Sequence, residues 1–153
     1  MITTIFFDND GVLVDTEKLW YETNQELLDA MGIPHTKNDF YQYQQITNLG
    51  SAGFLKTFHL SENEIQAFKK KRDQLWRKKI EAKRHIIPNA EMVLRQLAKD
   101  YRLCLATSAP KKNYEFAHRA TNILPLFERI VGREECKNLK PDPMVYLESM
   151  KLM

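Results

Sequence analysis

Two carboxylates, Asp8 and Asp10, directly follow an apolar run in the segment "IFFDNDGVLVDTE", which extends from Ile5 to Glu17. Side chains two residues apart on an extended chain point the same way, so both carboxylates can face one pocket. Carboxylates that close repel each other, and a divalent cation is the usual remedy. The first can then attack an electrophile while the second transfers protons. The structural alternative is an acidic turn that caps the next helix.

Further polar groups follow two later strand-like runs. Thr107 and Ser108 come at the end of "YRLCLATS", where two hydroxyls suit phosphate oxygens but also suit the cap of a helix. Lys140 stands in "NLKPDP", where the prolines can hold the ammonium group in place, although a lone lysine is usually a solvated surface charge. Carboxylates, hydroxyls and an amine on one rim have the composition of a magnesium–phosphate site.

The elements that must position these groups alternate between helix and strand. Ligands bind beyond the carboxyl ends of parallel strands, which is where these polar groups stand. From Pro88 onward the pattern reads helix, strand, helix, strand, helix, which predicts a parallel, doubly wound α/β sheet that includes the first strand. We expect buried strands at residues 3–8 and 101–107, a short strand at 129–132, and helices at 17–31, 62–84, 90–97, 112–121 and 144–153.

The helices between the first strand and the rest look like an insertion. We therefore expect a core made of residues 1–14 and 84–153, with residues 15–83 as a second, helical domain. Ser61 and Glu64 have the form of a capping box, which predicts a helix start at Glu62. Residues 34–53 are polar and aromatic and indicate no clear element.

The helix that begins at Glu62 is strongly basic. Between residues 68 and 84, nine Lys or Arg residues face only two acidic ones, which is a pattern that can bind nucleic acid or an acidic surface. A helical apolar stripe runs through the same segment, so the lysines are what remains outside. We favour a solvated helix face over nucleic-acid binding. The stripe consists of Ile65, Phe68, Leu75, Trp76 and Ile80.

The composition sets broad limits on class and location. The 153 residues are 43% hydrophobic and 28% charged, which fits one modest domain or a small core with an insertion. No apolar run is long enough to span a membrane, and the N-terminus lacks the features of a secretory signal. Cys104 and Cys136 make neither a disulfide framework nor a zinc site. We expect a cytoplasmic protein without a membrane partner.

The motifs resemble those of the haloacid dehalogenase-like hydrolases. The resemblance is to the branch of phosphatases and phosphomutases that includes β-phosphoglucomutase and phosphoglycolate phosphatase. It is carried by "DNDGVLVDTE" at residues 8–17, "ATSAP" at 106–110 and "KPDP" at 140–143. It implies a Rossmann-like core with an inserted α-helical cap over residues 15–83.

The resemblance also implies a role for each candidate residue. Asp8 would be the nucleophile that takes the phosphoryl group, and Asp10 would protonate the leaving oxygen and later activate water. Thr107 would bind the phosphate together with Ser108, and Lys140 would neutralise Asp8 and the phosphate. Mg²⁺ would bind the Asp8 carboxylate and the Asp10 backbone carbonyl. The implied enzyme is a Mg²⁺-dependent phosphatase that acts on a small phosphorylated metabolite through an aspartyl-phosphate intermediate.

Two departures from the family pattern qualify this expectation. The family completes its magnesium site with an acidic pair after a fourth strand, and this chain ends at Met153 before such a strand. We therefore expect a core that is incomplete at the C-terminus, and a first strand that lies at a sheet edge and promotes self-association. The alternative function is a catalytically impaired remnant that serves as a binding or interaction module.

The second departure lies in the cap. Sugar-phosphate mutases of the family tend to carry a histidine near the position of Trp20 and an arginine in the segment that matches residues 47–52. Here that segment is "TNLGSA", which has no basic residue. The resemblance therefore favours a phosphatase over a phosphomutase.

Overall fold

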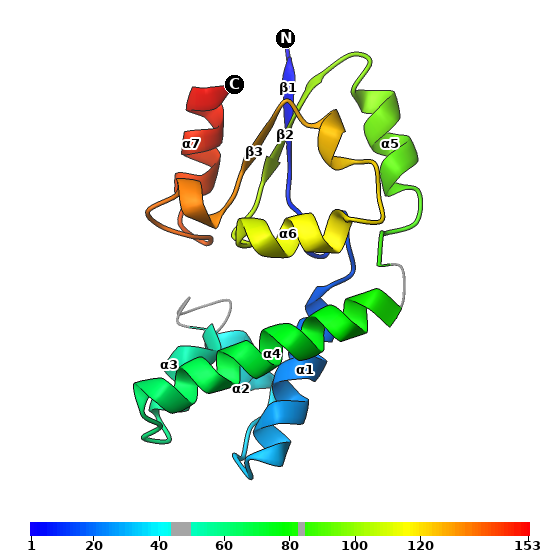
Figure 1. Ribbon diagram of the computed structural model, residues 1–153. Helices are drawn as coiled ribbons and strands as arrows, with labels where there is room; N and C mark the ends of the chain where they lie inside the picture. The colour runs from blue at the N-terminus through cyan, green and yellow to red at the C-terminus, as the bar shows by residue number, and fades with distance from the viewer. Residues whose placement is uncertain (44–49, 83–84) are drawn as a thin grey trace. The chain divides into compact units, whose positions relative to one another are not determined.

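The computed structural model describes residues 1–43, 50–82 and 85–153, which form a mixture of strands and helices (Figure 1). The chain forms two compact units. One unit contains Met1–Thr16 and Arg84–Met153, and the other contains Glu17–Lys83. The first unit carries the sheet and every predicted site residue, and the second is helical.

The sheet has three parallel strands in the order β1-β2-β3, namely β1 (Thr4–Phe7), β2 (Arg102–Ala106) and β3 (Arg129–Val131). Phe7 pairs with Leu105, and Ala106 pairs with Val131, so all three strands end at the same edge. This confirms the predicted α/β class with a parallel sheet. The segments that follow the strands therefore begin at one rim, as a strand-end site requires.

Helices pack on both faces of the sheet. Leu103 and Leu105 of β2 belong to a buried cluster with Leu94, whereas Cys104, on the opposite face, lies against Ser149. Figure 1 shows the two helices that carry Leu94 and Ser149 on opposite sides of the strands. The helices of this unit are α5 (Ala90–Leu97), α6 (Lys111–His118) and α7 (Met144–Leu152), with short 3₁₀ helices η2 (Leu124–Leu126) and η3 (Arg133–Glu135).

The first strand differs from its prediction in burial. We predicted a buried strand, but all four residues of β1 are only half-buried. The reason is the position of β1 at one end of the strand order, since β2 covers one of its edges and no described strand pairs with the other. In β2, which has a neighbour on each side, the four residues after Arg102 are buried.

The second unit consists of four helices in the part of the chain that the structure describes. The predicted capping box at Ser61 is confirmed, since its backbone N–H donates to the Glu64 carboxylate at 2.8 Å and its hydroxyl accepts from the Glu64 N–H at 3.4 Å. Four residues of the predicted apolar stripe are buried and Leu75 is half-buried, with Ile65 and Phe68 in the core of this unit. The helices are α1 (Glu17–Ala30), α2 (Lys37–Tyr41), α3 (Gly50–Lys56) and α4 (Glu62–Ala82).

None of the described helices has the combination of length and apolar character that crossing a bilayer requires.

Candidate active site

Lys140 connects the loops that follow β1 and β2. Its ammonium nitrogen lies 2.8 Å from Oδ1 of Asp8 and donates to the backbone oxygen of Ala106, also at 2.8 Å. Its backbone N–H donates to Oγ of Ser108 at 3.1 Å. The structure therefore brings together three of the residues that the sequence nominated, although Lys140 lies more than 130 positions from Asp8 in the chain. A cation placed this way neutralises the Asp8 carboxylate and can attract an anionic ligand.

The loop after β1 is a tight turn that depends on Gly11. The backbone oxygen of Asn9 accepts from the N–H of Leu13 at 2.8 Å, and Gly11 N–H donates to the oxygen of Val14, also at 2.8 Å. Gly11 has φ +76°, a left-handed conformation that side chains with a Cβ disfavour. A glycine at this position therefore allows the sharp exit of the chain from the strand.

Asp8 remains accessible within this turn. Its carboxylate is 35% exposed, and both Lys140 and the backbone N–H of Asn9 (2.7 Å) bond the same oxygen, Oδ1. In the described part of the chain, Oδ2 is thus left open to a ligand. An exposed carboxylate oxygen beside an ammonium group can serve as a nucleophile or as a metal ligand.

Asp10 is anchored on both oxygens. The hydroxyl of Thr16 donates to Oδ1, and the side-chain amide of Asn9 donates to Oδ2 at 3.2 Å. Asp10 itself is exposed, whereas Thr16 is buried. Sequence reasoning missed Thr16 although it lies inside the motif, because a threonine six residues after Asp10 reads simply as part of the entry to the next helix.

Asn9 is held from the opposite side by His118 of α6. Nε2 of His118 lies 2.7 Å from Oδ1 of Asn9, and both side chains are buried. Burial lowers the pKa of His118 to about 4, so the imidazole is neutral near pH 7. Nothing in the sequence suggested this contact, because the two residues are 109 positions apart.

Thr107 and Ser108 lie at the same rim in different roles. Thr107 is buried, its N–H donates to the oxygen of Val131 at 2.9 Å, and its hydroxyl oxygen accepts from the N–H of Ala109 at 3.1 Å. That arrangement leaves the hydroxyl proton of Thr107 available for an anion. Ser108 instead uses its oxygen to hold the backbone of Lys140.

The donor set at this rim suits Mg²⁺. The carboxylates of Asp8 and Asp10 and the adjacent backbone carbonyls are hard oxygen ligands, which Mg²⁺ prefers. Among the described residues there is no group of three or more His, Cys, Asp or Glu side chains that can hold a metal. Such a site would leave several coordination positions to water or substrate, which is common for Mg²⁺.

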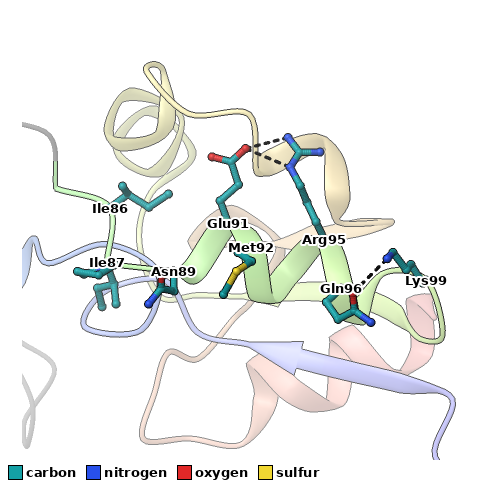
Figure 2. Close-up of a pocket in the computed structure, with 9 residues that line it drawn as sticks. Ile86, Ile87, Asn89, Glu91, Met92, Arg95, Gln96 and Lys99 are labelled. Carbon is teal, nitrogen blue, oxygen red and sulfur yellow. Dashed lines mark hydrogen bonds and ion pairs between the residues drawn. The ribbon is translucent and has the colours of Figure 1, made fainter.

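A pocket of about 620 Å³ lies elsewhere in the first unit, along α5 (Figure 2). Its lining residues fall between Ile86 and Lys99 and include none of the predicted site residues. Two of its charged side chains pair with each other, since Arg95 lies 2.9 Å from Glu91 (Figure 2). We therefore assign the chemistry to the strand ends and not to this pocket.

In the second unit, Arg72 contacts Ser51, which belongs to the segment without a basic residue. Residues 47–49 of the segment without a basic residue lie outside the described residues, but Ser51 is described. Arg72 of α4 donates from Nη1 to Oγ of Ser51 at 2.8 Å, and its guanidinium lies 4.2 Å from the ring centroid of Trp20. It also pairs with Asp73 at 2.7 Å. A guanidinium thus contacts Ser51 although residues 47–52 contain no basic residue, and the separation of 21 positions hid this contact from sequence reasoning.

Comparisons with known proteins agree with this fold. A family model described as "Haloacid dehalogenase-like hydrolase" matches residues 5–153. A "Phosphorylated carbohydrates phosphatase" of Thermotoga maritima is 26% identical over 144 residues, which cover 94% of this chain and 67% of that protein.

Two solved structures share the fold. A β-phosphoglucomutase of Clostridium difficile has a TM-score of 0.80 at 24% identity, with 99% of this chain and 70% of the other covered. A putative phosphoglycolate phosphatase of Lactobacillus plantarum has a TM-score of 0.73 at 17% identity, with 99% and 72% covered. With a parallel sheet, a carboxylate loop after its first strand and a family match over nearly its whole length, the chain belongs to the haloacid dehalogenase-like hydrolases.

Proposed function

We propose that the chain is a Mg²⁺-dependent phosphatase that acts on a small phosphorylated metabolite through an aspartyl-phosphate intermediate. The observation that carries the proposal is the 2.8 Å contact between Lys140 and Asp8 at the carboxyl ends of the strands. It pairs an accessible carboxylate with a cation that can hold an incoming phosphate. The family match and the phosphatase names of relatives support the same reaction class.

In the first half of the reaction, Oδ2 of Asp8 attacks phosphorus and the bond from phosphorus to the leaving oxygen breaks. Asp10 gives its proton to that oxygen. In the second half, Asp10 takes a proton from water, the water oxygen attacks phosphorus, and the bond to Asp8 breaks to release inorganic phosphate. Each carboxylate returns to its starting state, as general acid–base and nucleophilic catalysis require.

The other residues of the rim would stabilise charge. Lys140 faces Asp8 Oδ1 and would lie next to the phosphoryl oxygens, where fixed cations stabilise the transition state. Thr107 would donate its free hydroxyl proton to one of these oxygens, and Ser108 would keep Lys140 in place. Mg²⁺, held by the Asp8 carboxylate and the Asp10 backbone carbonyl, would neutralise further phosphoryl charge.

The proposed substrate class is a phosphorylated carbohydrate. The support is the name of the Thermotoga maritima relative, since nothing at the rim itself selects a leaving group. The helical unit would serve as the cap that the family resemblance implies.

A second candidate is a catalytically impaired chain that serves as a binding or interaction module. It is favoured by the absence, within the described residues, of a group of three potential metal-ligating side chains. The edge position of half-buried β1 offers such a module a surface for association.

A turnover assay separates the two candidates. Release of phosphate from 4-nitrophenyl phosphate and from a panel of sugar phosphates is measured with Mg²⁺ and with EDTA, for the native chain and for Asp8→Asn. The phosphatase requires turnover that depends on both Mg²⁺ and Asp8. Binding of these compounds without any phosphate release would instead establish the impaired module.

A further inference from the structure

Asn9 and His118 form a buried polar pair directly behind the loop that carries the two aspartates. Asn9 is 1% exposed and His118 is 2% exposed. Polar side chains are costly to bury unless they are hydrogen-bonded, and the contact of 2.7 Å between Nε2 and Oδ1 satisfies one group on each. The pair links α6 to the loop after β1, so it can restrict the motion of that loop.

The direction of the hydrogen bonds in this pair follows from Asp10. A carboxylate only accepts, so the group of Asn9 that faces Oδ2 of Asp10 at 3.2 Å is its amide NH₂. The amide oxygen then faces His118, which must donate from Nε2. Because burial lowers the pKa of His118 to about 4, the ring is neutral and carries this single proton. The series His118 to Asn9 to Asp10 therefore has one direction of donation.

Asp10 needs such support because it lies in an exposed position. An aspartate at a surface samples several rotamers, whereas proton transfer requires a fixed position relative to the leaving oxygen. Thr16 holds Oδ1, and Asn9 holds Oδ2. Each carboxylate oxygen can accept two hydrogen bonds, so Oδ2 can also carry the transferred proton.

We propose that His118 and Asn9 are positioning residues, in which His118 orients the Asn9 amide and Asn9 holds the Asp10 carboxylate for proton transfer. The inference rests on the proposed phosphatase function, which gives Asp10 its role as acid and base. It adds to that function two residues outside the reacting groups, one of them on a helix more than a hundred positions away.

The first test compares leaving groups. A nitrophenolate leaves without a proton, whereas the alkoxide of glucose 6-phosphate needs one. His118→Leu and Asn9→Leu should lower kcat/KM for glucose 6-phosphate roughly 10-fold and for 4-nitrophenyl phosphate less than about 3-fold, a part of what general acid catalysis contributes. His118→Gln, whose amide can donate to Asn9, should recover most of the loss. Equal losses on both substrates, or no rescue by Gln, would overturn the positioning role.

A double variant and a matched control sharpen the comparison. If His118 acts through Asn9, the variant with both leucines should lose no more kcat/KM for glucose 6-phosphate than Asn9→Leu alone. The reason is that the effects of substitutions within one hydrogen-bond network do not add. Ser149→Ala removes a buried polar group elsewhere in the same unit, a hydroxyl that donates to the oxygen of Val145 at 2.7 Å in α7. This control should leave the ratio of kcat/KM for glucose 6-phosphate to kcat/KM for 4-nitrophenyl phosphate unchanged. If the fold-losses of the two single variants multiply in the double variant, His118 does not act through Asn9.

A readout that does not need turnover separates this inference from the proposed function. In NMR spectra of the native chain, the side-chain amide of Asn9 should exchange slowly with solvent. His118→Leu should shift its resonance and speed exchange, and His118→Gln should not. A chain that hydrolyses neither substrate but shows this pattern would refute the phosphatase while supporting the orienting contact. An Asn9 amide that His118→Leu leaves unchanged would overturn the inference.

Discussion

Lys140 and Asp8 are in direct contact at the rim of the sheet, with 2.8 Å between Nζ and Oδ1. The ammonium nitrogen also bonds the oxygen of Ala106 at the end of β2, so it is fixed by two neighbouring strands. Asp8 keeps an accessible oxygen for a substrate, while Lys140 contacts its other carboxylate oxygen. This contact is the geometric basis of the proposed covalent mechanism.

Replacement of Lys140 by Met should lower kcat roughly 10²- to 10³-fold, because a fixed cation beside the phosphoryl group is lost. Steady-state kinetics with 4-nitrophenyl phosphate measures the change. Lys137→Met, at an exposed position of the same loop, is the matched control and should retain activity. Similar losses in both variants would indicate a general effect of the loop and contradict the role of Lys140.

The buried His118 should make stability depend on pH. Its pKa is about 4 in the folded chain, below the ordinary 6.5, so the unfolded chain binds the proton more readily. The neutral folded form keeps its full stability above pH 6.5 and loses it as the pH falls towards 4. Between pH 7 and pH 5 this amounts to about 2 kcal/mol.

Urea unfolding of the native chain and of His118→Gln at several pH values isolates this contribution, because other titrating groups are common to both proteins. The difference in unfolding free energy between the two proteins should shrink as the pH falls from 7 to 5. Parallel curves would mean that His118 is not held neutral in the folded chain.

Several features could be predicted from the sequence and others could not, for physical reasons. The strand-end carboxylates, the capping box at Ser61 and the parallel alternation depend on local pattern, and the structure contains them. The partners of Asn9 and Ser51 come from distant helices, and no local pattern encodes them. The apolar run by itself predicted a buried β1, which is wrong, whereas the edge position expected from the family resemblance agrees with a strand that is only half-buried at one end of the described sheet.

Mg²⁺ should bind weakly to the chain. Asp8 offers one carboxylate and Asp10 mainly a carbonyl, and the described residues contain no group of three potential ligating side chains. Fewer anionic ligands give a poorer site for a cation that dehydrates reluctantly. We expect a Kd on the order of 1 mM, equivalent to about 4 kcal/mol. Calorimetric titration with MgCl₂ measures it, and low-micromolar affinity would show that further ligands exist.

The chain should associate through β1 at high concentration. Arg102 N–H donates to the oxygen of Thr3, so the alternation of the strand directs the N–H of Thr4 to the edge without a described partner strand. Thr4→Pro removes that donor without touching the bonds to β2 and should weaken association. Light scattering over a range of concentrations measures the mass. A native chain that stays monomeric throughout would contradict this prediction.

Trapping the covalent intermediate shows whether Asp8 carries the phosphoryl group. The native chain is mixed with Mg²⁺ and 4-nitrophenyl phosphate, quenched in acid within a turnover and digested for peptide mass spectrometry. We expect one phosphoryl group on the peptide that contains Asp8, removable by hydroxylamine and absent from Asp8→Asn. A phosphoryl group on another residue, or unchanged turnover in Asp8→Asn, would contradict the covalent mechanism.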